Sequence, residues 1–368
     1  MRKVLDVIWG VRKQKSFCKG DWTAQITLRS HNKIARRESL TRLRCFASRP
    51  FSPTKGEGKS GGTQAVRHAL SGVMQDFTSA QIQTGETSIF IRSSGTGPPL
   101  LLLHGFPQTH LMWRGVAPLL AHEFTVVCAD LRGYGQSGCP ASAPDHAPYA
   151  KRAMARDMVT VMAQLGFTRF GVAGHDRGGR VAYRMALDHP DRVERLAVLD
   201  ILPIETAWER ADAGFMLGYW PWSLLAQPKP LPETILVVSA AAIIDNALGG
   251  WGSPSQAFPL EVRAAYIEAL RDIGHAHAIC EEYRAAASID RAHDRADRDA
   301  GRKIRAPVLA IWSAQGPLDS WYAEGPITLW RQWAGDVRGY ALKGGHFFPE
   351  AAPELTAQAL RRFFAHSD

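Results

Sequence analysis

The chain has 368 residues, of which 45% are hydrophobic and 21% are charged. These proportions are normal for a globular protein and exclude a chain that is disordered throughout. No apolar run reaches the roughly 18–20 residues that a membrane-spanning helix needs. The longest run, residues 235–244, is expected to form a buried helix, so we predict no membrane association.

The formal net charge of +9 is concentrated at the N-terminus. Residues 1–73 contain 16 Lys and Arg against 4 Asp and Glu, whereas the rest contains 28 basic and 31 acidic residues. A basic leader attracts polyanions without making the body a nucleic-acid reader, and we predict no nucleic-acid partner. We expect residues 1–73 to be a disordered extension, which a transit peptide or a mis-assigned start codon before Met74 would explain.

Five cysteines are spread widely through the chain without a CxxC pair. This spacing disfavours both a disulfide framework and a structural zinc site, and it fits a reducing compartment. We therefore predict a cytoplasmic protein with no metal.

Short apolar runs alternate with helical patterns from residue 87 onward. Strands are expected at residues 87–92, 99–103, 124–129, 170–173, 196–199, 308–311 and 337–342, and helices at residues 153–165, 321–333 and 350–364, with another ending near residue 188. This alternation is typical of an α/β fold whose mostly parallel sheet is covered by helices on both faces.

The alternation stops at residue 203 and resumes near residue 308. Residues 203–300 are rich in Trp, Ala, Pro and Arg, and are expected to form a helical cap inserted after strand 6. The predicted organisation is a sheet domain in two parts, residues 74–202 and 301–368, interrupted by this cap.

The sharpest chemical signal is Gly174-His175-Asp176-Arg177-Gly178, which follows an apolar strand and precedes a helix. This is the pattern of a nucleophile elbow, in which small flanking residues permit a strained turn that exposes the central side chain. A carboxylate there can attack an sp3 carbon and form an alkyl ester, which fits carbon–halogen or epoxide substrates. The alternative is that Asp176 only caps the following helix.

Hydrolysis of such an ester needs a base and an oxyanion hole. His346 follows the last expected strand, and hydrolase elbows place the base last in the chain, so His346 is the expected base. The backbone N–H groups of Phe106 and Arg177 are the expected oxyanion hole. His104 and His175 are weaker candidates for the base, because the first precedes the oxyanion loop and the second belongs to the elbow.

Two carboxylates are candidates for the acid that orients the base. Asp200 ends the strand after the elbow helix, and Asp319 follows the next strand. Either would hold the imidazole in the tautomer that a base requires.

Arg177 and Arg180 follow the nucleophile by one and four positions. Together they can bind a small substrate carboxylate and keep Asp176 ionised. The alternative is that they form buried structural ion pairs.

These motifs resemble those of the haloacetate (fluoroacetate) dehalogenases of the α/β-hydrolase superfamily, from about residue 77 to the C-terminus. The matching strings are HGFPQTH (104–110), DLRGYGQSG (130–138), GHDRGGR (174–180), VLDILP (198–203), LAQP (225–228), CEEYRA (280–285) and GGHFF (344–348). The resemblance implies an α/β-hydrolase fold with Asp176 as nucleophile, His346 as base and Asp200 as its acid. It also implies that Arg177 and Arg180 bind the substrate carboxylate.

The resemblance further implies a halide pocket lined from the cap by a His-Trp pair and a Tyr. Trp222 and Tyr283 match the last two, but this sequence has Pro221 where the family has His. Fluoride is a poor leaving group that needs strong hydrogen-bond donors, so we expect chloride or bromide release to survive better than fluoride release. The alternative is that both aromatic residues belong to the core of the cap.

The sequence therefore predicts a hydrolase that converts a small 2-haloacid into a 2-hydroxy acid and halide. One alternative is an epoxide hydrolase, with donors drawn from Tyr219, Tyr266 and Tyr283; another is a non-catalytic small-molecule binder. No cofactor is implied, because the nucleophile and the base are side chains. The expected partner is the small-molecule substrate, with a homodimer left open.

Overall fold

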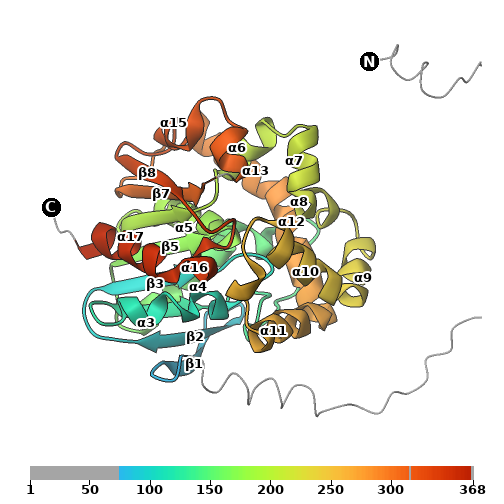
Figure 1. Cartoon of the computed structure of the whole chain (residues 1–368). Coiled ribbons are helices and arrows are strands. Elements are labelled where there is room, and N and C mark those ends of the chain that lie inside the picture. Colours follow the sequence, from blue (N-terminus) through green and yellow to red (C-terminus); the bar gives the residue numbers. More distant parts are fainter. Residues whose placement is uncertain (1–73, 315, 366–368) are drawn as a thin grey trace, which may run out of the picture. The chain divides into compact units, whose positions relative to one another are not determined.

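The computed structural model describes residues 74–314 and 316–365, so the expected extension at residues 1–73 lies outside them. In the described part, eight strands form one sheet in the order β1-β2-β4-β3-β5-β6-β7-β8 (Figure 1). The strands are β1 (Thr78–Gln83), β2 (Ser88–Ser94), β3 (Pro99–Leu103), β4 (Thr125–Ala129), β5 (Phe170–His175), β6 (Val193–Leu199), β7 (Val308–Ser313) and β8 (Val337–Leu342). Only the β1–β2 and β2–β4 pairs of this sheet are antiparallel. The predicted mostly parallel sheet is confirmed.

All seven expected strands are present, and β1 is one that the sequence pattern did not reveal. Five of the six residues of β1 are exposed, because it is the edge strand of the sheet. An edge strand that buries a single residue shows no clear alternation of apolar and polar residues, and alternation is the signal on which strand prediction depends.

The strands of the sheet are buried on both faces, as β3 illustrates. Leu101 and Leu103 join the core that packs against α4 (Lys151–Gln164), α5 (Arg177–Asp188) and α15 (Gly325–Arg331). Leu100 and Leu102 join the opposite core, beneath α3 (Ala117–Leu120) and α17 (Pro353–Ala365). Because successive strand residues point to opposite faces, a continuous apolar run is what a doubly covered sheet requires.

Helices fill the chain between β6 and β7 and form the cap. They are α6 (Ile204–Glu209), α7 (Ala213–Gly218), α8 (Trp220–Leu224), α9 (Leu231–Val238), α10 (Ala240–Gly250), η4 (Ser255–Ala257), α11 (Leu260–Arg271), α12 (Ile273–Ala287) and α13 (Ile289–Asp299). In Figure 1, α9, α10 and α11 lie to one side of the sheet. Shorter elements elsewhere are η2 (His110–Arg114), η3 (Ala147–Tyr149), α14 (Pro317–Ser320) and α16 (Phe348–Ala351).

The prediction of one buried helix over residues 235–244 is wrong. Ser239 leaves helical geometry, with φ −108° and ψ 19°, and the run is divided between α9 and α10, which meet at 82°. Val238, just before the bend, is 80% exposed, whereas Ile244 is buried in the core of the cap. Among the described residues, no single helix is long and apolar enough to cross a membrane. The bent pair of α9 and α10 reaches the required length and apolar composition only when its two helices are taken together.

Two helices expected near the C-terminus have different bounds because prolines decide where helices start. The helix expected at residues 321–333 begins only at Gly325, with Pro326 in its first turn, where a missing N–H costs nothing. The helix expected at residues 350–364 is divided into α16 and α17. Ala352 precedes Pro353 and is held outside the helical region, with φ −141° and ψ 60°.

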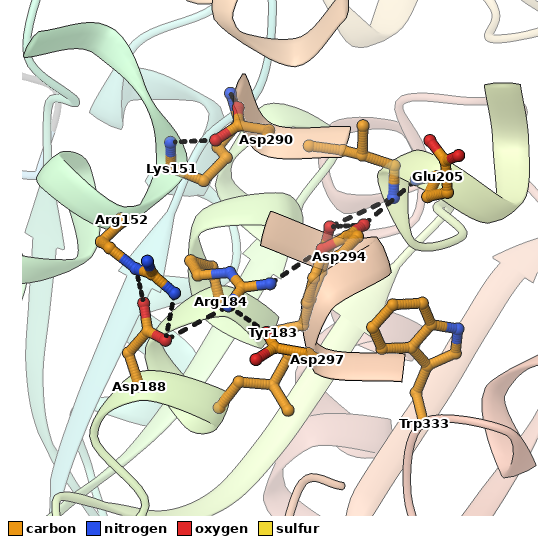
Figure 2. A network of polar contacts seen from close by, with 12 residues as sticks. Lys151, Arg152, Tyr183, Arg184, Asp188, Glu205, Asp290, Asp294, Asp297 and Trp333 are labelled. Carbon is orange, nitrogen blue, oxygen red and sulfur yellow. Dashed lines mark hydrogen bonds and ion pairs between the residues drawn. The ribbon is translucent and has the colours of Figure 1, made fainter. Parts of the chain in front are cut away.

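A buried ion-pair network joins the helix after the elbow to the last helix of the cap (Figure 2). Arg184 of α5 contacts Asp294 of α13 at 2.8 Å and Asp297 of α13 at 2.5 Å. The Tyr183 hydroxyl donates to the same Asp294 at 2.9 Å. Because an unpaired buried charge is costly, these contacts fix α5 and α13 to each other.

Candidate active site

Asp176 stands on a strained turn between β5 and α5. Its backbone has φ 45° and ψ −113°, a conformation that a non-glycine residue adopts only when the surroundings enforce it. A Cβ at Gly174 would lie 2.4 Å from the carbonyl oxygen of Gly178, and a Cβ at Gly178 would lie 2.4 Å from that of His104. The small flanking residues of the elbow are therefore required by close backbone approach.

The Asp176 carboxylate is buried, 6% exposed, among positive groups. The Phe106 N–H donates to its Oδ1 at 3.0 Å. Burial alone would raise the pKa of Asp176, but the positive charges of His346, Arg177 and Arg180 outweigh burial and lower the pKa to about 2. The structure thus keeps the carboxylate ionised at neutral pH, which nucleophilic attack by this group would require.

The backbone N–H groups of Phe106 and Arg177, which the sequence predicts as an oxyanion hole, have different surroundings. The Phe106 N–H already points at the Asp176 carboxylate, through the bond described above. Arg177 is the first residue of α5, where a backbone N–H has no partner inside the helix.

His346 lies in the loop after β8 and contacts Asp200. Its Nδ1 is 2.6 Å from Asp200 Oδ2, and Asp200 Oδ1 accepts from the Ser313 N–H at 2.8 Å. With Nδ1 donating to Asp200, Nε2 is the nitrogen that can accept a proton. Burial would lower the pKa of His346, but the Asp200 hydrogen bond and the charges of Asp200 and Asp176 raise it overall.

Asp319 occupies a different place from the other candidate acid. It lies in α14, exposed, and its Oδ1 accepts from Trp312 Nε1 at 2.9 Å. Of the two carboxylates weighed from the sequence, Asp200 is the one that contacts His346.

His104 and His175 are buried, and their ring nitrogens lie within hydrogen-bond distance of backbone groups. His104 Nε2 accepts from the Leu131 N–H at 3.0 Å, with Nδ1 2.9 Å from the Gly105 carbonyl oxygen. His175 Nε2 lies 2.8 Å from the carbonyl oxygen of His346. Burial, with the positive charge of His346, lowers the pKa of His175 to about 4, so this ring stays neutral beside His346.

Arg177 forms a buried ion pair with a cap residue that the sequence analysis did not single out. Its Nε lies 2.8 Å from both carboxylate oxygens of Glu282, and its Nη2 lies 2.5 Å from Oε1. Lys151 contacts the same carboxylate. Arg177 Nη1 is buried and has no hydrogen-bond partner within the described part of the chain. The Arg177 side chain thus takes part in a structural ion pair with Glu282 and also has one N–H donor that is not used.

Arg180 also combines a fixed contact with an unused donor. Its Nη1 donates to the Leu202 carbonyl oxygen, and its Nε is buried with no partner among residues 74–314 and 316–365. Since a buried N–H without an acceptor is costly, the unused donors of Arg177 and Arg180 favour an anionic ligand in the site.

Trp222 of α8 and Tyr283 of α12 cover the two arginines from the cap. The guanidinium carbon of Arg177 lies 4.0 Å from the centre of the Tyr283 ring, and that of Arg180 lies 4.5 Å from the Trp222 ring. Both aromatic side chains are buried. Pro221 occupies the first turn of α8 and has no side-chain donor to offer.

A cavity of about 480 Å³ opens beside His346, between the cap and the loops that follow β7 and β8. Tyr219 from the cap and Ser313, the last residue of β7, contribute to its lining. No cluster of potential metal ligands occurs in residues 74–314 and 316–365.

Sequence reasoning missed Glu282 and Lys151 because their role depends on the meeting of cap and core. Glu282 lies in the CEEYRA string next to Tyr283, but a string does not reveal which way a helical side chain points. Lys151 starts α4, where a basic residue normally indicates a solvated surface, yet here it is buried.

Comparison with known proteins agrees with this geometry. The family described as the alpha/beta hydrolase fold matches residues 98–348. The chain belongs to the alpha/beta hydrolase family. Solved relatives include a protein from Nostoc sp PCC 7120 (46% identity, TM-score 0.77, covering 80% of this chain and 99% of that one). Another is a Pseudomonas aeruginosa protein with bound MFA (42%, TM-score 0.74, 80% and 97%).

Two further relatives show which members of this family the chain is similar to. A fluoroacetate dehalogenase from Burkholderia sp is 43% identical over 80% of this chain and 95% of its own length. A soluble epoxide hydrolase from Corynebacterium sp. (strain C12) is 31% identical over 74% of this chain and 92% of its own length. The chain is thus an alpha/beta hydrolase related to fluoroacetate dehalogenase and to epoxide hydrolases.

Proposed function

We propose that this protein hydrolyses the carbon–halogen bond of a small 2-haloacid and releases halide and a 2-hydroxy acid. The observation that carries the proposal is the combination of a buried, ionised Asp176 on an elbow with two buried arginines that retain unused donors. A neutral substrate would leave those donors unpaired. A substrate carboxylate would accept from Arg177 Nη1 and Arg180 Nε, and would hold C2 near the nucleophile.

The first step is a displacement at C2. An Asp176 carboxylate oxygen forms a bond to C2, and the electrons of the carbon–halogen bond leave with the halide. Trp222 and Tyr283 supply the polar edges of the halide pocket in this proposal. The product is an alkyl ester of Asp176.

The second step is hydrolysis of that ester. His346 Nε2 takes a proton from water, and the hydroxide attacks the Asp176 carboxyl carbon. The oxyanion that forms is held by the Phe106 and Arg177 N–H groups. Collapse breaks the bond between the carboxyl carbon and the alkoxide oxygen, and the departing alkoxide takes the proton back from His346 to give the 2-hydroxy acid. The Asp176 carboxylic acid that remains, which carries the second proton of the water, loses it to solvent and becomes a carboxylate again.

Pro221 sets the expected halide preference. Without a donor at this position, the departing halide has one hydrogen bond fewer. Fluoride depends most on such donors, so chloroacetate and bromoacetate are expected to react faster than fluoroacetate.

Halide release from the full chain tests this function. Fluoroacetate, chloroacetate and bromoacetate are each incubated with the protein, and Asp176→Ala serves as the blank. A single turnover in 18O-labelled water should also place 18O in Asp176. Absence of halide from all three substrates would contradict the dehalogenase proposal, and unlabelled Asp176 after halide release would contradict the ester.

Epoxide hydrolysis is the second candidate, and it uses the same Asp176 and His346. Tyr266 is engaged by Glu350, to which its hydroxyl donates at 3.2 Å, which leaves Tyr219 and Tyr283 as the donor pair. The two buried arginines argue against this candidate, because a neutral epoxide offers them no negative charge. If no haloacetate reacts, styrene oxide is the next substrate.

A further inference from the structure

The loop that carries His346 rests directly against a segment of the cap. Gly344 and Gly345 both have positive φ, 132° and 73°. A Cβ added to Gly345 would lie 2.2 Å from the carbonyl carbon of Gly252 and 2.3 Å from the nitrogen of Ser253. Glycine is therefore required at Gly345 both by its conformation and by the close approach of the cap.

Backbone atoms on either side of His346 are hydrogen-bonded to this cap segment. The Ser253 hydroxyl donates to the Gly344 carbonyl oxygen at 2.6 Å and accepts from the Phe347 N–H at 3.0 Å. The His346 N–H itself donates to the Trp251 carbonyl oxygen at 2.9 Å. One buried hydroxyl, on a residue that is 5% exposed, thus bridges the loop across the histidine.

These contacts bear on the position of the imidazole, because β8 has ended and α16 has not begun at His346. The ring is held on one side by Asp200, at 2.6 Å. Its backbone is held from the other side by the cap. A catalytic group must stay within a fraction of an ångström of its working position, and a shift of about 1 Å can cost a hundredfold in rate.

We propose that Ser253 is a positioning residue through which the cap holds the base His346 in place. This inference rests on the proposed function, because it assigns His346 to ester hydrolysis. The hydrogen bonds of the Ser253 hydroxyl go to the backbone of the His346 loop, so in this proposal Ser253 acts through that loop and not on the substrate. Its removal should therefore slow the step that uses His346 and spare the displacement that uses Asp176.

The test is Ser253→Ala in the full chain, with chloroacetate as substrate. We expect kcat to fall about tenfold or more, and kcat/KM to stay within about twofold, because kcat/KM covers only the steps through irreversible ester formation. A burst of chloride and the carboxymethyl ester of Asp176, seen by mass spectrometry, should accompany the fall. Ser253→Thr, which keeps a hydroxyl, should restore kcat.

The matched control is Ser255→Ala, an exposed serine two positions further along the same segment. It should behave as the unaltered protein. Equal falls of kcat and kcat/KM in Ser253→Ala, without accumulated ester, would overturn the proposal, as would an unchanged kcat.

A second measurement separates this inference from the proposed function. The proton between His346 Nδ1 and Asp200 gives a low-field NMR signal that Asp200→Asn should abolish. We expect Ser253→Ala to broaden or shift this signal at a temperature where Ser255→Ala keeps it. An unchanged signal would refute the positioning role even if no haloacetate is a substrate. Conversely, a lost signal together with no halide release would leave the positioning role standing and remove the dehalogenase proposal.

Discussion

Replacement of Glu282 by Gln tests the buried charge cluster behind the site. Glu282 is fully buried between Arg177, with N–O distances of 2.5–2.8 Å, and Lys151. The amide removes the negative charge and leaves two buried cations beside each other. Breaking a buried ion pair from one side costs about 3–5 kcal/mol.

The expected result follows from that magnitude. Native domains are stable by about 5–15 kcal/mol, so Glu282→Gln should remove a large share of the stability. With an unfolding entropy of about 2.1 cal/mol/K per residue over roughly 290 described residues, a loss of about 3–5 kcal/mol lowers Tm by about 5–8 °C. Arg177 should also lose its orientation, so KM for chloroacetate should rise. Adding Lys151→Met to Glu282→Gln should recover part of the stability, since the second buried cation is then absent.

Thermal and urea denaturation measure the stability, and steady-state kinetics measure KM. The matched control is Glu268→Gln, which removes an exposed carboxylate whose pair with Arg271 is worth at most about 1 kcal/mol. A Glu282→Gln protein with unchanged Tm and unchanged KM would refute the reasoning that this cluster holds Arg177.

Three further predictions concern the chemistry. The first concerns pH. kcat should fall as the pH drops, because a protonated His346 is no base, and the midpoint should lie below the raised pKa that His346 has in the free protein, because the ester removes the Asp176 charge that helps to raise it. kcat/KM should stay flat down to about pH 4, because Asp176, with a pKa of about 2, remains ionised; pH profiles of both parameters check this. Pro221→His should raise the ratio of fluoride to chloride release about tenfold by adding a donor, and Pro221→Ala should not; an equal gain from both would mean that the donor is irrelevant. Asp200→Asn should lower kcat by about 10³–10⁴-fold and Asp319→Ala by less than twofold; the reverse ranking would exchange their roles.

Much of the core of this molecule was predictable because its signals are local. Short stretches of sequence are enough to recognise the strand before Asp176, the glycines around it and the alternation of strands and helices. The same holds for the cap as an interruption between β6 and β7. The sequence analysis missed the bend at Ser239, between α9 and α10, and the break at Ala352, between α16 and α17. An apolar run or a helical period does not show where tertiary packing or a proline ends a helix.

The contacts that complete the site were not predictable, because each joins residues far apart in the chain. Glu282 meets Arg177 across the boundary between cap and core, 105 positions away. Ser253 reaches the His346 loop across 91 and 94 positions. Position in the chain alone did not separate Asp200 from Asp319, since both follow parallel strands. Only the family resemblance favoured Asp200, the carboxylate that lies 2.6 Å from His346 Nδ1.

The charges around Asp176 link the two steps of the proposed reaction. In the free protein, the Asp176 carboxylate is among the groups that raise the pKa of His346. Formation of the ester removes that negative charge, while Arg180, whose charge lowers the pKa of His346, remains. The imidazole is therefore pushed toward its neutral form at the moment when it must accept a proton from water. Displacement at C2 thus prepares the base for the hydrolysis that follows.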